Sequence, residues 1–179
     1  MSKPPILIAG TGALANLFAA RLSSAGPPVS MLGSWPAGLD ALRTKGVLLH
    51  DADGGTTVYP VEVSEDPADF AGAQLALVLV KAWQTERAAE QLAACLASDG
   101  LALTLQNGLG NRETLAARLG DERVAFGVTT TGANLLGPGQ VRAGGEGLIS
   151  LGAHPRLATL AAALKGDGFQ VQEVETVAS

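Results

Sequence analysis

Short, continuously apolar stretches alternate along the chain with longer stretches whose apolar residues recur at helical spacing. The first apolar run, Ile6–Ala9, meets a glycine at once, as expected of a strand that is buried on both faces of a parallel sheet. Apolar residues then recur every three or four positions over residues 13–25, and Gly26-Pro27-Pro28 prevents a helix from continuing. The N-terminal part of the chain therefore predicts a buried strand followed by an amphipathic helix.

The same alternation continues through the rest of the chain. It predicts further strands at residues 29–32, 75–80, 101–105, 123–128, 148–151 and 169–174, and helices at 39–45, 85–97, 111–119 and 155–165. Residues 47–50 and 56–59 flank a turn-rich connector, which predicts an inserted hairpin, and the Thr- and Gly-rich segments after Thr129 predict short antiparallel strands. We therefore predict an α/β fold of the Rossmann type: a doubly wound, mainly parallel sheet with helices on both faces and short antiparallel additions.

Composition narrows the class of protein and its partners. The chain has 179 residues, enough for one ordinary domain, and is 47% hydrophobic and 16% charged, unlike a disordered chain. Its net charge of -5 and pI near 4.9 would repel phosphate backbones and anionic lipid headgroups. We expect neither a nucleic-acid nor a membrane partner.

The N-terminus and the single cysteine indicate the compartment. The apolar run after Pro4 is shorter than a signal-peptide core, and no segment approaches the length of a membrane span. Cys95 cannot form an internal disulfide, and it falls in an Ala/Leu-rich stretch where we expect it to be buried and inert. These observations predict a cytoplasmic protein.

A G-x-G-x-x-A loop joins the first predicted strand to the first predicted helix and reads Gly10-Thr11-Gly12-Ala13-Leu14-Ala15. In dinucleotide-binding folds the first glycine permits the turn, the second lets the backbone approach a pyrophosphate, and the third small residue allows close helix packing. The helix N-terminus adds unpaired N–H groups and partial positive charge. Such a tripeptide could be only a tight turn, but its position between strand and helix favours cofactor binding. We expect residues 1–179 to form one dinucleotide-binding domain.

The end of the second predicted strand bears on the choice between NAD and NADP. An acidic residue that would bind a ribose 2′-hydroxyl is absent there, and the strand runs into Gly33-Ser34-Trp35. A carboxylate at this position would repel a 2′-phosphate, so its absence is compatible with NADP but does not demonstrate NADP binding. Ser34 could bind a ribose oxygen or phosphate and Arg43 could approach it, or both could be ordinary surface residues.

Two later strands end in polar residues. One is followed by Lys81-Ala82-Trp83-Gln84, and the next by Gln106-Asn107-Gly108. Each could be explained by solvent exposure or turn chemistry alone. Ligands of open α/β sheets nevertheless bind outside the carboxyl ends of the strands, so together with the glycine loop these residues favour a site. His50 and His154 belong to no comparable group, and we predict no metal site and no catalytic triad.

With these residues in view, the chain resembles the N-terminal cofactor-binding domain of the ketopantoate reductase (2-dehydropantoate 2-reductase) family. The resemblance spans essentially the whole chain. It rests on the glycine loop, on Val80-Lys81-Ala82-Trp83-Gln84-Thr85, on Leu105-Gln106-Asn107-Gly108-Leu109-Gly110 and on Gly127-Val128-Thr129-Thr130-Thr131-Gly132-Ala133.

The resemblance implies an oxidoreductase that uses NADPH to reduce 2-dehydropantoate to pantoate, on the way to pantothenate and coenzyme A. It implies that the loop from Gly10 to Ala15 holds the pyrophosphate and that Lys81 lies beside the nicotinamide ribose and the substrate. Asn107 would bind both the cofactor and the substrate hydroxyl, and Ala133 would contribute a backbone contact at the nicotinamide end. The expected small-molecule partner is a keto acid.

Departures from the family pattern leave alternatives open. Ser34 stands where NADP-preferring members commonly have a basic residue, so NAD stays a candidate cofactor. Ala15 replaces a frequent glycine and is a tolerated small residue. The family's proton-donating lysine and its helical substrate and dimerisation domain, with a possible homodimer, are expected after Ser179. The alternatives are a related 2-keto-acid or imine reductase, or a non-catalytic NAD(P)-binding sensor.

Overall fold

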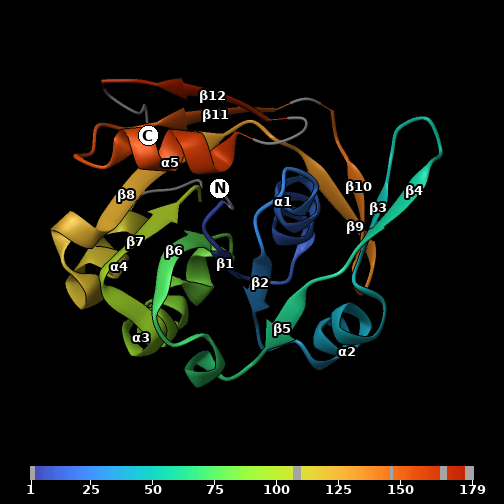
Figure 1. Ribbon diagram of the computed structural model, residues 1–179, viewed down its shortest axis with the longest axis horizontal. Helices are drawn as coiled ribbons and strands as arrows, with labels where there is room; N and C mark the ends of the chain where they lie inside the picture. The colour runs from blue at the N-terminus through green and yellow to red at the C-terminus, as the bar shows by residue number, and fades with distance from the viewer. Residues whose placement is uncertain (1–2, 107–109, 146, 166–168, 176–179) are drawn as a thin grey trace.

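The computed structural model describes residues 3–106, 110–145, 147–165 and 169–175, and its centre is a sheet of eight strands (Figure 1). Across the sheet the strands are β12 (Phe169–Glu173), β11 (Gly147–Leu151), β8 (Val124–Thr129), β7 (Leu96–Thr104), β6 (Ala73–Val78), β1 (Ile6–Ala9), β2 (Val29–Leu32) and β5 (Glu62–Ser64). Every neighbouring pair is parallel except β8 and β11. The predicted mainly parallel sheet is confirmed.

Alternate residues of the central strand face two separate apolar layers. Ile6 and Ile8 belong to the cluster that contains Phe18 of α1 (Ala13–Ser24) and Leu160 of α5 (Leu157–Leu164). Leu7 and Ala9 belong to the other cluster, with residues of α3 (Thr85–Cys95) and α4 (Asn111–Leu119). Because successive side chains of a strand point to opposite faces, helices cover both sides of the sheet, as predicted (Figure 1).

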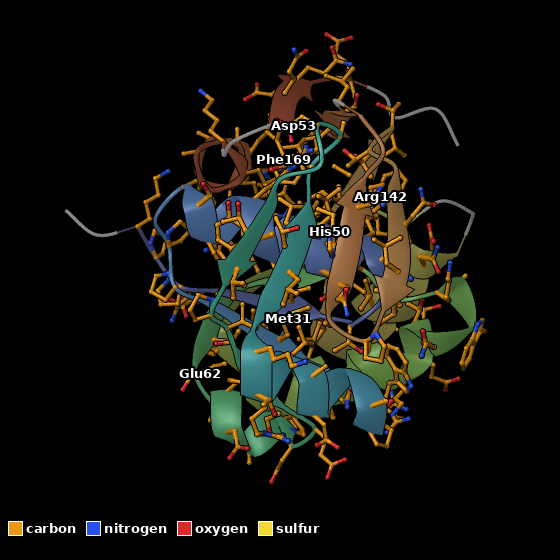
Figure 2. All side chains as sticks on the ribbon, turned by 90° about the vertical axis from the view of Figure 1, so that its right-hand side faces the viewer. Met31, His50, Asp53, Glu62, Arg142 and Phe169 are labelled. Atoms are coloured by element: carbon orange, nitrogen blue, oxygen red, sulfur yellow. The ribbon has the colours of Figure 1, made fainter. Side chains whose placement is uncertain are left out.

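A second, four-stranded sheet lies against α1. Its order is β4 (Thr56–Tyr59), β3 (Val47–His50), β10 (Gln140–Ala143) and β9 (Ala133–Gly137). Val47, Leu49 and Val141 are buried in the same cluster as α1, while His50 and Arg142 lie on the face turned toward the viewer in Figure 2. The predicted hairpin is confirmed, but it is part of this separate sheet because β3 pairs in parallel with the distant β10.

The boundary between α3 and β7 differs from the prediction. The helix predicted over residues 85–97 ends at Cys95, and Leu96 already begins a strand that continues to Thr104. Leu96 pairs with Ala73 of β6, and the Arg123 guanidinium donates hydrogen bonds to the carbonyls of Leu96 and Ala97 at 3.4 and 2.7 Å. These tertiary partners override the helical preference of an Ala/Leu-rich stretch.

Four further helical elements were not predicted in full from the sequence pattern. Helix α2 (Pro36–Lys45) begins three residues before the predicted start, because Pro36 occupies its first turn. The short 3₁₀ helices η1 (Pro67–Phe70) and η2 (Ala82–Gln84) precede β6 and α3, and η3 (Asp121–Arg123) precedes β8. Strand β5 was also unforeseen, and it extends the sheet beyond β2.

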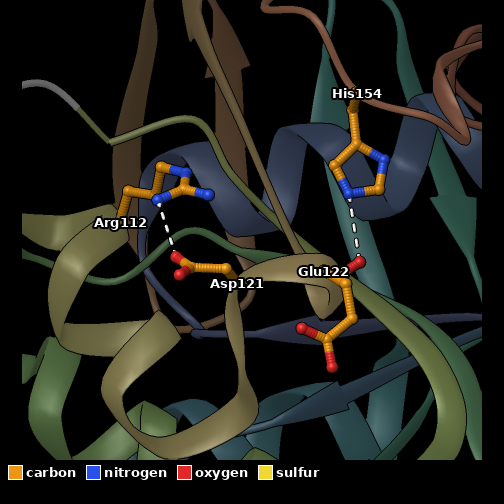
Figure 3. Close-up of polar contacts among 4 residues, drawn as sticks. All are labelled: Arg112, Asp121, Glu122 and His154. Carbon is orange, nitrogen blue, oxygen red and sulfur yellow. Dashed lines mark hydrogen bonds and ion pairs between the residues drawn. The ribbon is translucent and has the colours of Figure 1, made fainter.

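Polar contacts fix the surface turns next to α4 (Figure 3). Arg112 Nη1 lies 3.3 Å from Asp121 Oδ1, and His154 Nε2 lies 3.2 Å from the Glu122 carbonyl oxygen. His154 Nδ1 also accepts a hydrogen bond from the Arg156 backbone N–H at 3.0 Å. Both ring nitrogens of His154 therefore have structural partners.

Candidate functional site

A pocket of about 620 Å³ opens at the carboxyl ends of β1, β2, β6 and β7. Strand β1 lies between β2 and β6, so the chain order reverses here and the loops after the strands diverge. In open α/β sheets this switch point is the usual ligand site. Predicted residues that line the pocket are Gly10, Thr11, Gly12, Ala13, Leu14, Ser34, Lys81 and Ala133.

Two predicted residues do not appear in that wall. Ala15 is fully buried beneath the loop, in the cluster between α1 and the sheet, where a small side chain allows close packing. Asn107 lies outside the described residues. Arg43, the alternative cation near Ser34, does not line the pocket, and its exposed side chain pairs with Asp40 at 3.4 Å.

The two glycines of the loop serve different physical needs. Gly10 has a φ of +131°, and a Cβ on it would lie 2.8 Å from the Leu79 carbonyl oxygen, so the turn itself requires glycine. Gly12 has a φ of -83°, which any residue can adopt, and its Cβ would meet no atom within 4 Å. Gly12 therefore leaves open space in the pocket wall that the fold does not need.

A buried amide holds this loop in shape. Asn16 is 0% exposed, and its Nδ2 donates to the carbonyl oxygens of Thr11 at 2.9 Å and Gly12 at 2.7 Å. The peptide N–H groups at the start of α1 stay available to a ligand while the carbonyls are turned toward Asn16. The sequence analysis missed Asn16, although a polar residue among the apolar positions of α1 was a visible signal.

The end of β2 packs closely on the loop. A Cβ on Gly33 would lie 2.5 Å from Thr11 Cγ2, and the Gly33 N–H donates to the Ser64 carbonyl of β5 at 3.2 Å. The Thr11 side chain therefore occupies the space that a side chain at position 33 would need. Ser34 and Trp35 follow directly and line the pocket.

Lys81 follows β6, which neighbours β1 on the side away from β2, and it stands at the start of η2 with an exposed side chain. The Lys81 backbone N–H donates to Gln84 Oε1 at 3.2 Å, and the Gln84 backbone N–H donates to the Lys81 carbonyl at 2.8 Å. These reciprocal bonds fix the backbone of Lys81, while its ammonium group is free to reach into the pocket that it lines.

A buried hydrogen-bond relay joins the loops after β6 and β7. Gln106 Nε2 donates to the Val80 carbonyl at 2.7 Å and to Thr85 Oγ1 at 3.0 Å, and its Oε1 accepts from Thr104 Oγ1 at 2.9 Å. Thr85 Oγ1 in turn donates to Asn111 Oδ1 of α4 at 3.0 Å. Both N–H donors of the Gln106 amide and its oxygen are hydrogen-bonded, so Val80, just before Lys81, is joined to Gln106, just before Asn107.

One stripe that begins at the end of η2 and continues along α3 forms a wall in which the sequence analysis identified only Gln84. Gln84, Arg87, Ala88 and Gln91 line the pocket, and their spacing is that of one helix face. Arg87 and Lys81 are the only charged side chains among the described lining residues, which include no carboxylate. In a chain of net charge -5, this pocket is suited to an anionic ligand.

Other kinds of site find no support in the described part of the chain. No group of three or more His, Cys, Asp or Glu residues there could hold a metal ion, and no helix there is long and apolar enough to cross a membrane. Cys95 is 2% exposed, and burial raises the pKa of its thiol. The thiol is therefore kept protonated.

A match to a protein-family model shows which family this chain belongs to. The family model for the ketopantoate reductase PanE/ApbA matches residues 6–156. These residues include the glycine loop, the segment that contains Lys81, the threonines that follow Val128, and the second sheet. The chain belongs to the ketopantoate reductase family. The expected family resemblance is thereby confirmed.

Two proteins of this family match nearly the whole of this chain, one in sequence and one in structure. The 2-dehydropantoate 2-reductase of Halobacterium salinarum is 35% identical over 171 residues, which are 92% of this chain and 56% of that protein. A PanE/ApbA family ketopantoate reductase from Ralstonia eutropha superposes with a TM-score of 0.88 at 31% identity, covering 97% of this chain and 57% of the other.

A more distant structure shares the fold alone. The ternary structure of D-mandelate dehydrogenase with NADH and anilino(oxo)acetate has a TM-score of 0.89 at 24% identity and covers 97% of this chain and 57% of the other. This chain thus spans a little over half the length of each of these proteins.

Proposed function

We propose that the pocket binds a reduced nicotinamide dinucleotide, as the cofactor-binding part of a reductase that converts 2-dehydropantoate to pantoate. The observation that carries the proposal is the open space at Gly12. A Cβ there would contact nothing, yet Gly12 is the helix-capping residue of a strand–loop–helix unit at the switch point of the sheet. A glycine that the backbone does not require is explained by a ligand that comes close.

The residues of the loop fit the phosphates of such a cofactor. Backbone N–H groups at the start of α1 would bind the pyrophosphate, helped by the partial positive charge of the helix terminus. The Asn16 amide would keep the carbonyls of Thr11 and Gly12 away from these anions. Ser34, Ala133 and the stripe on α3 would enclose the nucleoside ends.

Lys81 is proposed to act on the keto acid. The bound cofactor supplies a hydride to the keto carbon. The ammonium group of Lys81 would stabilise the negative charge that develops on the keto oxygen, and Asn107 is proposed to bind both cofactor and substrate. Lys81 has a fixed backbone and a free side chain, an arrangement that allows its charge to be aimed without strain.

The proton for the nascent hydroxyl is proposed to come from a helical region outside these residues. The relatives are longer than this chain, which covers 56% of the Halobacterium protein. We propose that the additional region provides the proton donor, completes the keto-acid pocket and forms a homodimer. The described pocket then accounts for cofactor binding and for part of the substrate site.

NADPH is the proposed cofactor, with NADH as the alternative. Two cations and no carboxylate line the described pocket, which favours the ligand with the additional phosphate. NADH is bound in the D-mandelate dehydrogenase of similar fold, which keeps NADH as the alternative.

Calorimetric titration with NADPH and NADH tests the proposal, using the substitution Gly12→Asp. Because no atom lies within 4 Å of a Cβ at Gly12, the variant is expected to fold normally while its carboxylate crowds and repels the pyrophosphate. We expect binding to weaken by at least about 100-fold, the equivalent of roughly 2.8 kcal/mol.

Gly137→Asp is the matched control. Gly137 also has open space, since its Cβ would have Gln140 Nε2 as nearest neighbour at 3.9 Å, and it does not line the pocket. Its affinity should equal that of the parent protein. Equal binding by the Gly12→Asp variant, or none by the folded parent, would refute the proposed function.

A further inference from the structure

Arg87 is a cation in the pocket wall without an assigned role. It lies in the first part of α3 with an exposed side chain, and it lines the pocket together with its neighbours Ala88 and Gln91. The ion pairs of the described residues join Arg43, Arg112 and Arg118 to carboxylates, and none involves Arg87. Its guanidinium group is therefore available to a ligand.

The apolar cluster in which α3 packs extends to the end of β2. Ala88, the next residue along the helix, belongs to the same apolar cluster as Leu32, the last residue of β2, and both line the pocket. The chain continues from Leu32 through Gly33 to Ser34. Arg87 and Ser34 therefore line the same pocket, one from α3 and the other from the segment that follows β2.

Besides Lys81, Arg87 is the one charged side chain among the described residues that line the pocket. Ser34 and Trp35 follow β2 without an acidic or basic neighbour, and Arg43 of α2 is engaged with Asp40 outside the pocket. A phosphate monoester carries about −1.5 to −2 charge at pH 7. A bound phosphate here would need a cation, and a planar guanidinium can donate two parallel hydrogen bonds to it.

We propose that Arg87, with the Ser34 hydroxyl, binds the adenosine 2′-phosphate of NADPH and thereby sets the preference of this pocket for NADPH over NADH. The inference rests on the proposed function, because it assigns one subsite of the same cofactor. The charges of the pocket are then divided among three groups: the α1 terminus binds the pyrophosphate, Lys81 serves the keto oxygen, and Arg87 binds the 2′-phosphate.

The decisive experiment compares NADPH with NADH in calorimetric titrations of the parent protein and of Arg87→Gln. Removing a charge-assisted interaction is expected to weaken NADPH binding by roughly 10- to 100-fold. NADH has no 2′-phosphate, so its affinity should change by less than about twofold. Arg87→Lys, which keeps the charge but loses the planar fork, should fall between the parent and Arg87→Gln for NADPH.

Arg43→Gln is the matched control, because Arg43 is an exposed arginine that does not line the pocket. It should bind both cofactors like the parent protein. Unchanged NADPH affinity in Arg87→Gln overturns the inference, and so does an equal loss for both cofactors, which would place Arg87 at a part that they share. If the folded parent binds neither dinucleotide, the proposed function fails and this inference falls with it.

Discussion

At the scale of single residues, the site depends on places where a side chain is missing. Thr11 and Gly33 show this most directly, since the methyl group of one fills the space that a side chain on the other would need. The contact joins the loop after β1 to the end of β2, the two segments that would hold the pyrophosphate and the adenosine. One methyl group at position 33 would thus act on both.

Gly33→Ala is expected to displace the glycine loop. The new Cβ would lie 2.5 Å from Thr11 Cγ2, closer than unbonded carbon atoms approach, so Thr11 must move. We expect a loss of about 1–3 kcal/mol in the free energy of unfolding, measured by urea denaturation, together with weaker NADPH binding.

The double substitution Gly33→Ala/Thr11→Ala provides the control. It removes both atoms that crowd most closely and leaves the Thr11 Cβ at 3.4 Å, an ordinary contact. Stability and affinity should return to those of Thr11→Ala alone. A double variant as damaged as Gly33→Ala would show that the Thr11 contact is not the cause.

At the scale of secondary-structure elements, the loops after β6 and β7 act as one unit because Gln106 joins them. Gln106→Leu keeps the approximate side-chain volume. It removes the three hydrogen bonds that the Gln106 amide makes to the Val80 carbonyl and to the hydroxyls of Thr85 and Thr104. The Val80 carbonyl loses this donor and the Thr104 hydroxyl loses this acceptor, which should lower the free energy of unfolding by about 1–3 kcal/mol.

Gln140→Leu is a suitable comparison for urea denaturation. The Gln140 side chain is hydrogen-bonded to the ring of His50, and this contact is only partly buried, on the outer face of the second sheet. It should cost less than about 0.5 kcal/mol. If both leucine variants lose the same stability, the relay does not hold the loops. Thr85→Val should add little to Gln106→Leu, because the two residues belong to one network.

Much of the fold and part of the site followed from local patterns. Continuously apolar runs identified β1 and most of β6, and the later half of β7, because parallel strands buried on both faces are continuously apolar. Strand β5 and the joining of the hairpin to β10 were not predicted, since Glu62–Ser64 has little apolar character and pairing with distant strands leaves no local signal.

The same distinction explains which site residues were found. Lys81 and Ser34 directly follow strands, where the rule for open sheets directs the search. Arg87 lies in the body of a helix, and only the tertiary packing of α3 brings it to the pocket. The helix-face spacing of Gln84, Arg87 and Gln91 was present in the sequence, but nothing local indicated which way that face points.

At the scale of the whole molecule, the burial of Cys95 gives stability a specific dependence on pH. Burial raises the thiol pKa in the folded state, so in alkali the unfolded chain releases this proton first. The contribution of Cys95 is therefore fully present below the ordinary thiol pKa. It declines by up to about 1.4 kcal/mol per pH unit as the pH rises from there to the folded pKa.

Urea denaturation at several pH values, compared between the parent and Cys95→Ala, isolates this effect from other alkaline titrations. The parent should lose stability relative to the alanine variant as the pH rises. A constant difference at all pH values would contradict the assignment.

The second sheet also bears on the order in which the pocket assembles. Strand β3 pairs with β10, so that His50 stands opposite Arg142 after a long intervening stretch of chain, and β9 carries Ala133 to the pocket from that same sheet. Contacts between distant segments form slowly, because a long loop must close before they are gained. During synthesis the glycine loop and the strands beside it emerge well before this partner strand, so the pocket at the glycine loop acquires its last wall late in folding.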